Sequence, residues 1–369
     1  MEYKLSDLAT IKYGKNQKKV VSELGTIPIY GTGGLMGYAT NFLYDQPSVL
    51  IGRKGTISKV RFVTHPFWTV DTLFYTIINE KIIRPHYFYY LMTQVDLLKL
   101  NEGTTIPSLR TETLNKITLK VPNLDEQDNI LSVLEPIDEK IELNEKINKN
   151  LEQQAEAIFQ SSIGNAISTV NLGEIADVKG GKRLPKGINL IDIPNTHPYI
   201  RVRDLNNALF ASLTPDYAYV DEETQKSISR YIVSTGDVLI SIVGTIGLTA
   251  IVDSTLDKAN LTENCVKVTN LKHITPEYLL LYLRSQLGRE AIAKGTVGAV
   301  QQKLPIKNIQ AIPIPLLIEK DKNTLFCTLD SIFAEISSNV IQSAKLASLR
   351  DTLLPKLMSG ELDVSNIDL

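Results

Sequence analysis

Lysines and arginines beside glycine and glutamine are the residues of this 369-residue chain best suited to chemistry with another molecule. They fall in turn-rich segments, where glycine lets the backbone approach a ligand closely. Arginine recognises guanine through paired hydrogen bonds, and glutamine pairs with adenine in the same way. We therefore predict a polyanion-binding contact set of Lys15, Lys18, Lys19, Tyr30, Thr32, Gly33, Gly34, Arg53, Lys54, Arg110, Lys182, Arg183, Lys186, Arg201, Arg203, Gln301, Gln302 and Lys303.

Each member of this set, taken singly, is equally well explained as an ordinary surface charge. The run of Lys15, Lys18 and Lys19 fits a solvated face better than a site. Arg201 and Arg203 alternate on an expected strand, so both would point the same way. The glycine spacing near Tyr30 resembles a dinucleotide loop, but such a loop must open a helix, and strand and turn are expected here.

No residue pattern in the chain indicates catalysis. The Asn/Asp-Pro-Pro-Tyr/Phe motif of adenine methyltransferases and the GxxxxGK[ST] phosphate loop do not occur. The histidines His65, His86, His197 and His273 are scattered, so neither a metal site nor a catalytic site is predicted.

The elements that must position the contact set occur twice in the chain. The segment KLSDLATIKYGK, which begins at residue 4, is similar to NLGEIADVKGGK, which begins at residue 171, an offset of 167. VLIGRKGTI from Val49 matches VLISIVGTI from Val238, and PHYFYYLMTQ from Pro85 matches PEYLLLYLRSQ from Pro276, with offsets of 189 and 191. An internal repeat decides the architecture, and here it predicts a pseudo-two-fold molecule with extra loop in the second copy.

Each copy has a mixed pattern of strands and helix. In the first copy we expect strands at 49–51, 59–63 and 73–78 and a helix at 85–100. In the second we expect strands at 238–242, 249–252 and 266–269 and a helix at 276–293. We call residues 1–123 the first head and residues 165–318 the second head.

A long helix is expected after each head, near residues 125–162 and 319–358. Apolar residues recur at alternating spacings of four and three from Ile130 to Ile158, and the pattern returns 195 residues later. This heptad spacing is typical of coiled coils, although ordinary bundle helices remain an alternative. The predicted seam contains Ile137, Ile141, Asn144, Leu151, Ile332, Ile336, Asn339 and Leu346.

Asn144 and Asn339 lie at the centres of their two patterns, so they would meet if the helices pair antiparallel. A buried asparagine pair would cost stability and fix the register. Pro136 removes a helical hydrogen bond, so we expect the first long helix to start near it, after a short kinked piece. Such a helix would span roughly 40 Å, similar to one turn of duplex DNA, roughly 34–36 Å.

The overall charge of −2 hides a strong local division. Residues 1–122 hold 15 basic and 9 acidic side chains, whereas residues 123–164 hold 3 and 10. Residues 165–315 hold 16 and 14, and residues 316–369 hold 5 and 8. Basic heads joined by acidic helices are compatible with nucleic-acid binding, because phosphate neutralisation depends on the local field.

The chain has two cysteines, Cys265 and Cys327, so a disulfide framework is not expected. Neither a secretory leader nor an apolar run near 18 residues is apparent. We therefore predict a cytoplasmic, soluble protein.

The repeated segments together resemble the specificity subunit of type I restriction-modification systems. The resemblance covers essentially the whole chain and rests on the order of short motifs. They are IPIYGTGGLMGYATNFLYDQPSVLIGRKGTI, PSLRTETLNKITLKVPNLDEQ, GGKRLPKG, HPYIRVRDL, GDVLISIVGTIG and LRDTLLPKLMSGEL.

The resemblance implies a fold of two mixed α/β (α+β) target-recognition domains separated by two long antiparallel coiled-coil helices. The domains would be residues 1–123 and 165–318, with spacer helices at 124–164 and, with a C-terminal tail, at 319–369. It also implies a non-catalytic, DNA-binding subunit without a cofactor of its own. Its partners would be double-stranded DNA, two modification subunits that use S-adenosylmethionine to methylate adenine, and a restriction subunit that uses ATP and magnesium.

The two heads differ where recognition is expected. Ser241-Ile242-Val243 replaces Gly52-Arg53-Lys54, and no counterpart of the YGTGG loop is evident in the second head. We therefore predict an asymmetric, bipartite target. The alternative is a stand-alone nucleic-acid or carbohydrate binding array with stacking aromatics at Tyr30, Tyr38, Trp68 and Tyr199.

The outer faces of the long helices are predicted to bind the partner subunit. The apolar residues expected to be exposed there are Leu131, Ile147, Phe159, Leu349 and Leu354.

Overall fold

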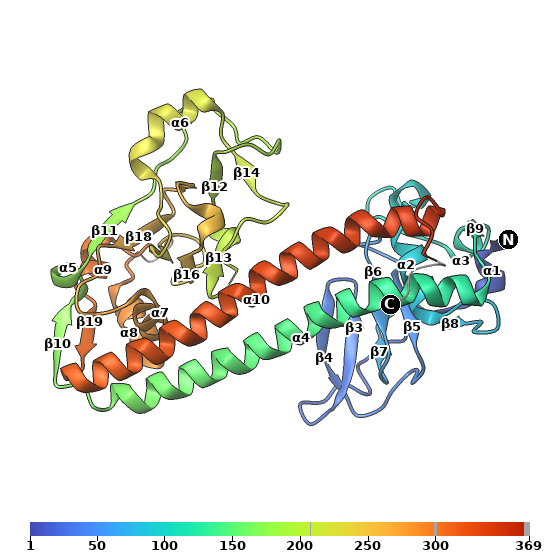
Figure 1. Cartoon of the computed structure of the whole chain (residues 1–369), viewed down its shortest axis with the longest axis horizontal. Coiled ribbons are helices and arrows are strands. Elements are labelled where there is room, and N and C mark those ends of the chain that lie inside the picture. The colour runs from blue at the N-terminus through green and yellow to red at the C-terminus, as the bar shows by residue number, and fades with distance from the viewer. Residues whose placement is uncertain (207, 299–300, 365–369) are drawn as a thin grey trace. The chain divides into compact units, whose positions relative to one another are not determined.

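A computed structural model describes residues 1–206, 208–298 and 301–364 of the chain. The chain forms two compact units, the first from residues 1–142 with the chain from Ser343 onward, and the second from residues 143–342. Both units contain part of the long helices α4 (Leu124–Ile163) and α10 (Glu319–Ser359), which are green and red in Figure 1. No helix within the described ranges is both long and apolar enough to cross a membrane.

Unit 1 combines three small sheets with short helices. Its strands are β1 (Glu2–Lys4), β2 (Ala9–Tyr13), β3 (Ile27–Gly31), β4 (Gly34–Ala39), β5 (Ser48–Gly52), β6 (Val60–Val63), β7 (Trp68–Thr69), β8 (Leu73–Ile78) and β9 (Thr118–Lys120). Its short helices are α1 (Leu5–Leu8), α2 (Pro85–Thr93), the 3₁₀ helix η1 (Leu97–Leu100) and α3 (Thr111–Leu114). The sheet orders are β2-β8-β5-β6, β4-β3-β7 and β1-β9.

Unit 2 repeats this topology with an addition. Its strands are β10 (Ser168–Asn171), β11 (Asp177–Gly180), β12 (Pro198–Ile200), β13 (Phe210–Ala211), β14 (Ala218–Tyr219), β15 (Val238–Ser241), β16 (Thr249–Val252), β17 (Asn260–Leu261), β18 (Cys265–Thr269) and β19 (Pro313–Leu316). Its short helices are α5 (Leu172–Ile175), η2 (Val202–Leu205), α6 (Glu222–Ile228), η3 (Ser229–Tyr231), η4 (Ser254–Leu256), α7 (Pro276–Arg284), α8 (Gln286–Gly295) and α9 (Ile306–Gln310). The sheet orders are β11-β18-β15-β16-β13, β14-β12-β17 and β10-β19.

The four strands of the largest sheet in unit 1 match four of the five strands in unit 2, where β13 is added at the edge. β5 and β15, the two copies of the apolar VLI run, are buried along their whole length between neighbouring strands, as a central strand requires. In both units a parallel strand, β7 or β17, borders the three-stranded sheet. The predicted mixed α/β fold with two long packed helices is confirmed.

The extra chain of the second copy lies mainly between β12 and β14. In unit 1 the equivalent strands β3 and β4 are joined by Thr32-Gly33 alone, whereas in unit 2 the described residues 201–206 and 208–217 belong to this connection. This replacement explains why the YGTGG loop has no counterpart in the second head.

The helix predicted at 276–293 is divided at Ser285. Ser285 has an extended backbone, with φ −66° and ψ 166°, and its Oγ accepts a hydrogen bond from Gly288 N at 3.2 Å. This is an N-cap, so the chain ends one helix and begins another at that point. In the first head the helix predicted at 85–100 ends at Thr93 and is followed by η1.

The long helices pack side by side in each unit, and every predicted seam residue is buried or half-buried. In unit 2, Asn144 Nδ2 donates to Gln342 Oε1 at 2.9 Å and to Asn339 O at 3.4 Å. Asn339 Nδ2 donates to Asn148 Oδ1 at 2.9 Å. The later residue of α4 meets the earlier residue of α10, so the helices run antiparallel there.

The start predicted for the first long helix is wrong, because α4 begins at Leu124 and continues through Pro136. A proline costs one backbone hydrogen bond inside a helix. The residues around it are held by packing, since Ile130, Leu131 and Leu134 are buried in the core of unit 1. This burial offsets the lost hydrogen bond.

The predicted outer partner face is also largely wrong. Leu131, Phe159 and Leu354 are 7%, 1% and 6% exposed, because each packs into the core of its own unit. Ile147 is half-buried, and Leu349 is 48% exposed. The long helices therefore use their apolar residues mainly to hold the heads.

Candidate nucleic-acid interface

A tight turn follows β5 in unit 1, at Arg53, Lys54 and Gly55. Lys54 pairs with Ser108 in an isolated antiparallel bridge, and Leu109 N donates to Arg53 O at 2.9 Å. Gly55 has a φ of +89°, a left-handed conformation that glycine adopts without strain. The turn is thereby fixed against the loop that precedes α3.

Two arginines are oriented around this turn. Arg53 Nη1 donates to Asp71 O at 2.9 Å, and its guanidinium carbon lies 5.2 Å from the centre of the Tyr13 ring. Arg110 Nε lies 3.1 Å from Glu102 Oε2, while the Arg110 side chain is 70% exposed. Because a guanidinium has five donors, both side chains keep donors for a further acceptor.

The tip of the β3–β4 hairpin lies beside the same turn. A Cβ atom placed on Gly55 would be 3.7 Å from Thr32 Oγ1. Arg61 lies over the Tyr30 ring at 5.3 Å, and burial raises the pKa of Tyr30 above its ordinary value. The predicted residues Thr32 and Gly33 form the turn between β3 and β4, and Gly34 is the first residue of β4, so no helix starts there.

The predicted lysine run is divided between two places. Lys15 lies two residues after the end of β2, and its backbone N donates to Thr69 O of β7 at 2.9 Å. Lys18 and Lys19 lie in a turn followed by Val21, which bridges Ala39 at the end of β4 away from the hairpin tip. The structure therefore does not bring Lys18 and Lys19 to the Arg53 turn.

Unit 2 builds the same turn-and-loop scaffold from different side chains. Val243 pairs with Lys303, and Leu304 N donates to Ile242 O at 3.0 Å. Gly244 has a φ of +79°. The exposed residues of the supporting loop include Gln301, Gln302 and Lys303.

A second basic segment in unit 2 leaves β11 through Gly181. Lys182 N donates to Leu261 O at 2.8 Å, and its ammonium lies 5.4 Å from the centre of the Tyr231 ring. Arg183 Nε lies 2.7 Å from Glu263 Oε1 in an exposed pair, and this hydrogen bond raises the pKa of Arg183. Lys186 follows in the same exposed loop.

The strand predicted for Arg201 and Arg203 is wrong, because β12 ends at Ile200 and η2 begins at Val202. Asp204 Oδ2 accepts hydrogen bonds from Arg201 N at 2.8 Å and from Arg201 Nε at 2.9 Å. This local pairing turns the chain into a 3₁₀ helix, so the two arginines do not alternate on one strand face. The Arg203 side chain is 67% exposed.

The aromatic residues considered for a stacking array are mostly enclosed. Tyr30 and Tyr199 are 9% and 3% exposed, and Trp68 is half-buried with its indole Nε1 donating to Lys15 O at 2.8 Å. Tyr38, at 46% exposed, is the one of the four that offers an open ring. These four residues do not form a stacking platform.

Several residues of the scaffold were missed at the sequence level. Tyr13 and Arg61 contact Arg53 and Tyr30, respectively, and no local motif marks them. Gly103 and Gly298 hold the two supporting loops, where a Cβ atom would overlap the carbonyl oxygens of Ile106 and Gln301. Their separation of 195 residues equals the helix offset, a signal that would have found them.

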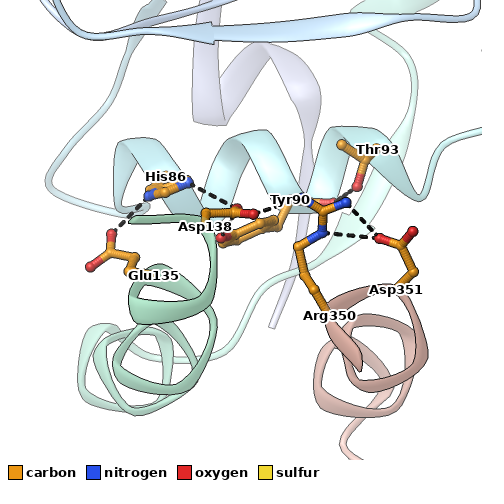
Figure 2. Close-up of polar contacts among 7 residues, drawn as sticks. All are labelled: His86, Tyr90, Thr93, Glu135, Asp138, Arg350 and Asp351. Atoms are coloured by element: carbon orange, nitrogen blue, oxygen red, sulfur yellow. Dashed lines mark hydrogen bonds and ion pairs between the residues drawn. The ribbon is translucent and has the colours of Figure 1, made fainter. Parts of the chain in front are cut away.

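A polar network joins three helices of unit 1 (Figure 2); its members are His86, Tyr90 and Thr93 of α2, Glu135 and Asp138 of α4, and Arg350 and Asp351 of α10. Asp138 accepts hydrogen bonds from Tyr90 Oη at 2.5 Å and from Arg350 Nη1 at 2.6 Å. Burial alone would lower the pKa of Arg350, but hydrogen bonds to Asp138 and Asp351 raise it. The network fixes α2 against both long helices.

No group of three or more histidine, cysteine, aspartate or glutamate side chains among the described residues could hold a metal ion. Cys265 is buried, and burial raises the pKa of its thiol to about 12, so the thiol stays protonated. The exposed cationic turns are the features that a large anionic ligand could contact.

Comparison with known proteins gives a consistent result. The family model described as type I restriction modification DNA specificity domain matches residues 1–153 and 166–346. The MjaIX type I restriction enzyme specificity subunit of Methanocaldococcus jannaschii is 24% identical over 362 residues, covering 88% of this chain and 80% of that protein. The HindI specificity subunit of Haemophilus influenzae is 22% identical over 369 residues, covering 77% and 79%.

A solved structure shares the fold. The S subunit of the type I restriction-modification system of M. genitalium aligns with a TM-score of 0.61 at 17% identity, covering 97% of this chain and 95% of that one.

Proposed function

The chain belongs to the type I restriction-modification DNA specificity family, and from this premise we propose that its two heads read the two halves of one asymmetric, split DNA sequence. As a specificity subunit it is non-catalytic and determines the target sequence of its system. Residues 1–123 and 165–318 serve as the two target-recognition domains. Residues 124–164 and 319–369 serve as the helical spacers and the C-terminal tail.

One observation carries this proposal: the two heads present different side chains on the same backbone scaffold. The turn after the central strand carries Arg53 in one head and Ile242 in the other, and these two residues accept the same loop hydrogen bond. Base edges in the major groove are distinguished by donor and acceptor patterns, so different side chains at equivalent places select different bases. An asymmetric target is the expected consequence.

The enzymatic steps belong to partner subunits in this proposal. A modification subunit supplies S-adenosylmethionine and methylates adenine, and a restriction subunit supplies ATP-driven translocation and cleavage. Two modification subunits bind each specificity subunit, in keeping with its duplicated architecture. The assembly works in the cytoplasm, on the DNA of its own cell.

The test is co-expression of the full chain with the neighbouring modification gene, followed by single-molecule sequencing of methylated adenines. We expect one split motif that disappears when this chain is deleted. Arg53→Ala should alter one half of the motif, and Gln302→Ala should alter the other half. Lys81→Ala is the matched control, because Lys81 is exposed and follows the opposite end of β8 from the Arg53 turn.

Methylation that persists without the chain would refute the specificity role. If Arg53→Ala changed both halves equally, the assignment of one half-site to each head would be wrong.

A further inference from the structure

Backbone hydrogen bonds that fix the turn against its loop recur at equivalent positions in the two heads. Leu109 N donates to Arg53 O at 2.9 Å in the first head, and Leu304 N donates to Ile242 O at 3.0 Å in the second. One further backbone bond at 2.9 Å also recurs, from residue 102 to residue 108 and from residue 297 to residue 303. Residues at matching points of these bonds are therefore structurally equivalent.

This equivalence places Lys54 with Val243 and Ser108 with Lys303. By sequence alone, each head has a lysine where the other has an uncharged residue. In the structure, however, Lys54 faces Ser108 across one bridge and Val243 faces Lys303 across the other. Each bridge therefore carries one lysine, contributed by opposite strands in the two heads.

Opposite residues of an antiparallel pair point to the same face, with Cβ atoms about 4.5–5.5 Å apart. Lysine carries a compact charge on a flexible four-carbon stem. The ammonium groups of Lys54 and Lys303 can thus reach equivalent positions on their heads despite starting from opposite strands. Both side chains are exposed, and neither makes an ion pair with any residue that the structure describes.

We propose that Lys54 and Lys303 are equivalent contacts to the DNA phosphate backbone, one in each head, and that neither reads a base. This inference rests on the proposed function and deepens it. A point charge on a flexible stem tolerates a shift of its anchor across the bridge when the acceptor is a phosphate. Base readout needs a fixed donor and acceptor geometry and would not survive that shift.

The two neighbouring arginines of the first head, unlike the lysine, have no basic residue at the equivalent or facing position of the second head. Arg53 and Arg110 have Ile242 and Pro305 as counterparts, with no charge restored across either pair. Their guanidinium groups are oriented by Asp71 and Glu102. Each head therefore has one lysine at this bridge, Lys54 in the first and Lys303 in the second.

The experiment transplants the arrangement of the second head into the first. The full chain, co-expressed with its modification subunit, is titrated at several salt concentrations with a duplex containing the methylated motif and with a scrambled duplex. Lys54→Val should weaken binding to both duplexes by the same factor and make the slope of log affinity against log salt shallower by about 0.9. Lys54→Val combined with Ser108→Lys should restore the slope.

Lys81→Val serves as the control for loss of a lysine away from the turn, and the unfolding midpoint of each variant is measured alongside. The methylated motif should be unchanged in the single and double variants, because a phosphate contact carries no sequence information.

Failure of the double variant to restore the slope, with its unfolding midpoint unchanged, would overturn the inference. A changed base in the methylated motif of Lys54→Val would overturn it as well, by making Lys54 a reader. If the wild-type complex does not bind the motif duplex more tightly than the scrambled one, the proposed function itself fails. That outcome is distinct from a failed transplant in a complex that binds specifically.

Discussion

Replacing Asp138 with alanine should destabilise unit 1, whereas replacing Asp138, Tyr90 and Arg350 together with apolar residues should not. Asp138 accepts hydrogen bonds from Tyr90 and Arg350, and the carboxylate is only 22% exposed. The Arg350 side chain is 27% exposed and keeps Asp351 as a partner at 2.8 Å. Asp138→Ala therefore leaves a half-buried guanidinium with one carboxylate instead of two.

The magnitude follows from the two hydrogen bonds that are lost. A hydrogen bond to a charged group contributes about 1.5–3 kcal/mol, and partial exposure reduces that value through solvent screening. We expect Asp138→Ala to cost about 2 kcal/mol. Asp351→Ala should cost less than about 1 kcal/mol, because the Asp351 side chain is 65% exposed.

The second unit supplies the design for the apolar replacement. The repeat offsets of 191 and 195 make Leu281, Phe333 and Ala155 the counterparts of Tyr90, Asp138 and Arg350. All three are buried, at 4%, 2% and 0% exposed. The same helix contact is therefore built without charge in unit 2.

A triple variant with Tyr90→Leu, Asp138→Phe and Arg350→Ala copies that apolar contact into unit 1. Replacing a buried ionic cluster by packed apolar residues of similar total volume is often neutral or stabilising. We expect the triple variant to lie within about 1 kcal/mol of the wild type, although the three single costs added together would exceed this.

Urea unfolding followed by tryptophan fluorescence measures the effect in the correct unit. The chain has one tryptophan, Trp68, and it lies in unit 1. A triple variant whose midpoint falls at least as far as that of Asp138→Ala would refute the reasoning. It would show that the charged cluster is needed for unit 1 to fold, and not merely for its own charges to be paired.

Three further outcomes are expected. In the native full chain a thiol reagent near neutral pH should label Cys327, which is exposed, but reach Cys265 only after unfolding, since burial raises the pKa of Cys265 to about 12; mass spectrometry of the labelled peptides checks this. Gly103→Ala should reduce DNA affinity, because a Cβ atom at this position would overlap Ile106 O and displace the loop. The free energy of unfolding, measured in urea, should fall by less than about 2 kcal/mol. Arg84→Ala should raise the pKa of Asp128, because a hydrogen bond from Arg84 holds this pKa low; NMR titration of the carboxyl group measures the change. The stability that the pair contributes is fully present above about pH 3.9, the pKa of an unfolded aspartate, and is lost as the pH falls through the lower pKa of the folded state.

The duplicated fold could be predicted because each copy has its own apolar pattern within short segments of the sequence. The apolar VLI run predicts a buried central strand in both heads, and β5 and β15 are those strands. The heptad spacing likewise predicts two packed helices, and Asn144 and Asn339 are buried where their seams meet. Local periodicity was enough for these features.

Contacts between distant segments could not be predicted in the same way. The bridge between Val243 and Lys303 depends on a loop closing against a turn, and no spacing along the chain marks the pair. The break at Ile200 did have a local signal, because Asp204 stands three residues after Arg201, as in a capping box. Alternation of two arginines was the weaker indication, and local hydrogen bonding prevailed over it.

The separation of framework from surface explains how the two heads can differ in sequence preference without differing in fold. The core of each unit takes residues from its head and from both long helices, such as Leu134 and Leu357 in unit 1 and Phe159 and Leu329 in unit 2. Arg53 and Gln302 belong to neither core and lie on loops that backbone hydrogen bonds and glycines hold in place. A substitution in these loops changes the groups offered to DNA at little cost in stability, because surface changes away from caps and cores usually fall within about 0.5 kcal/mol. Specificity can therefore change one head at a time, while the helices and sheets that carry both heads stay the same.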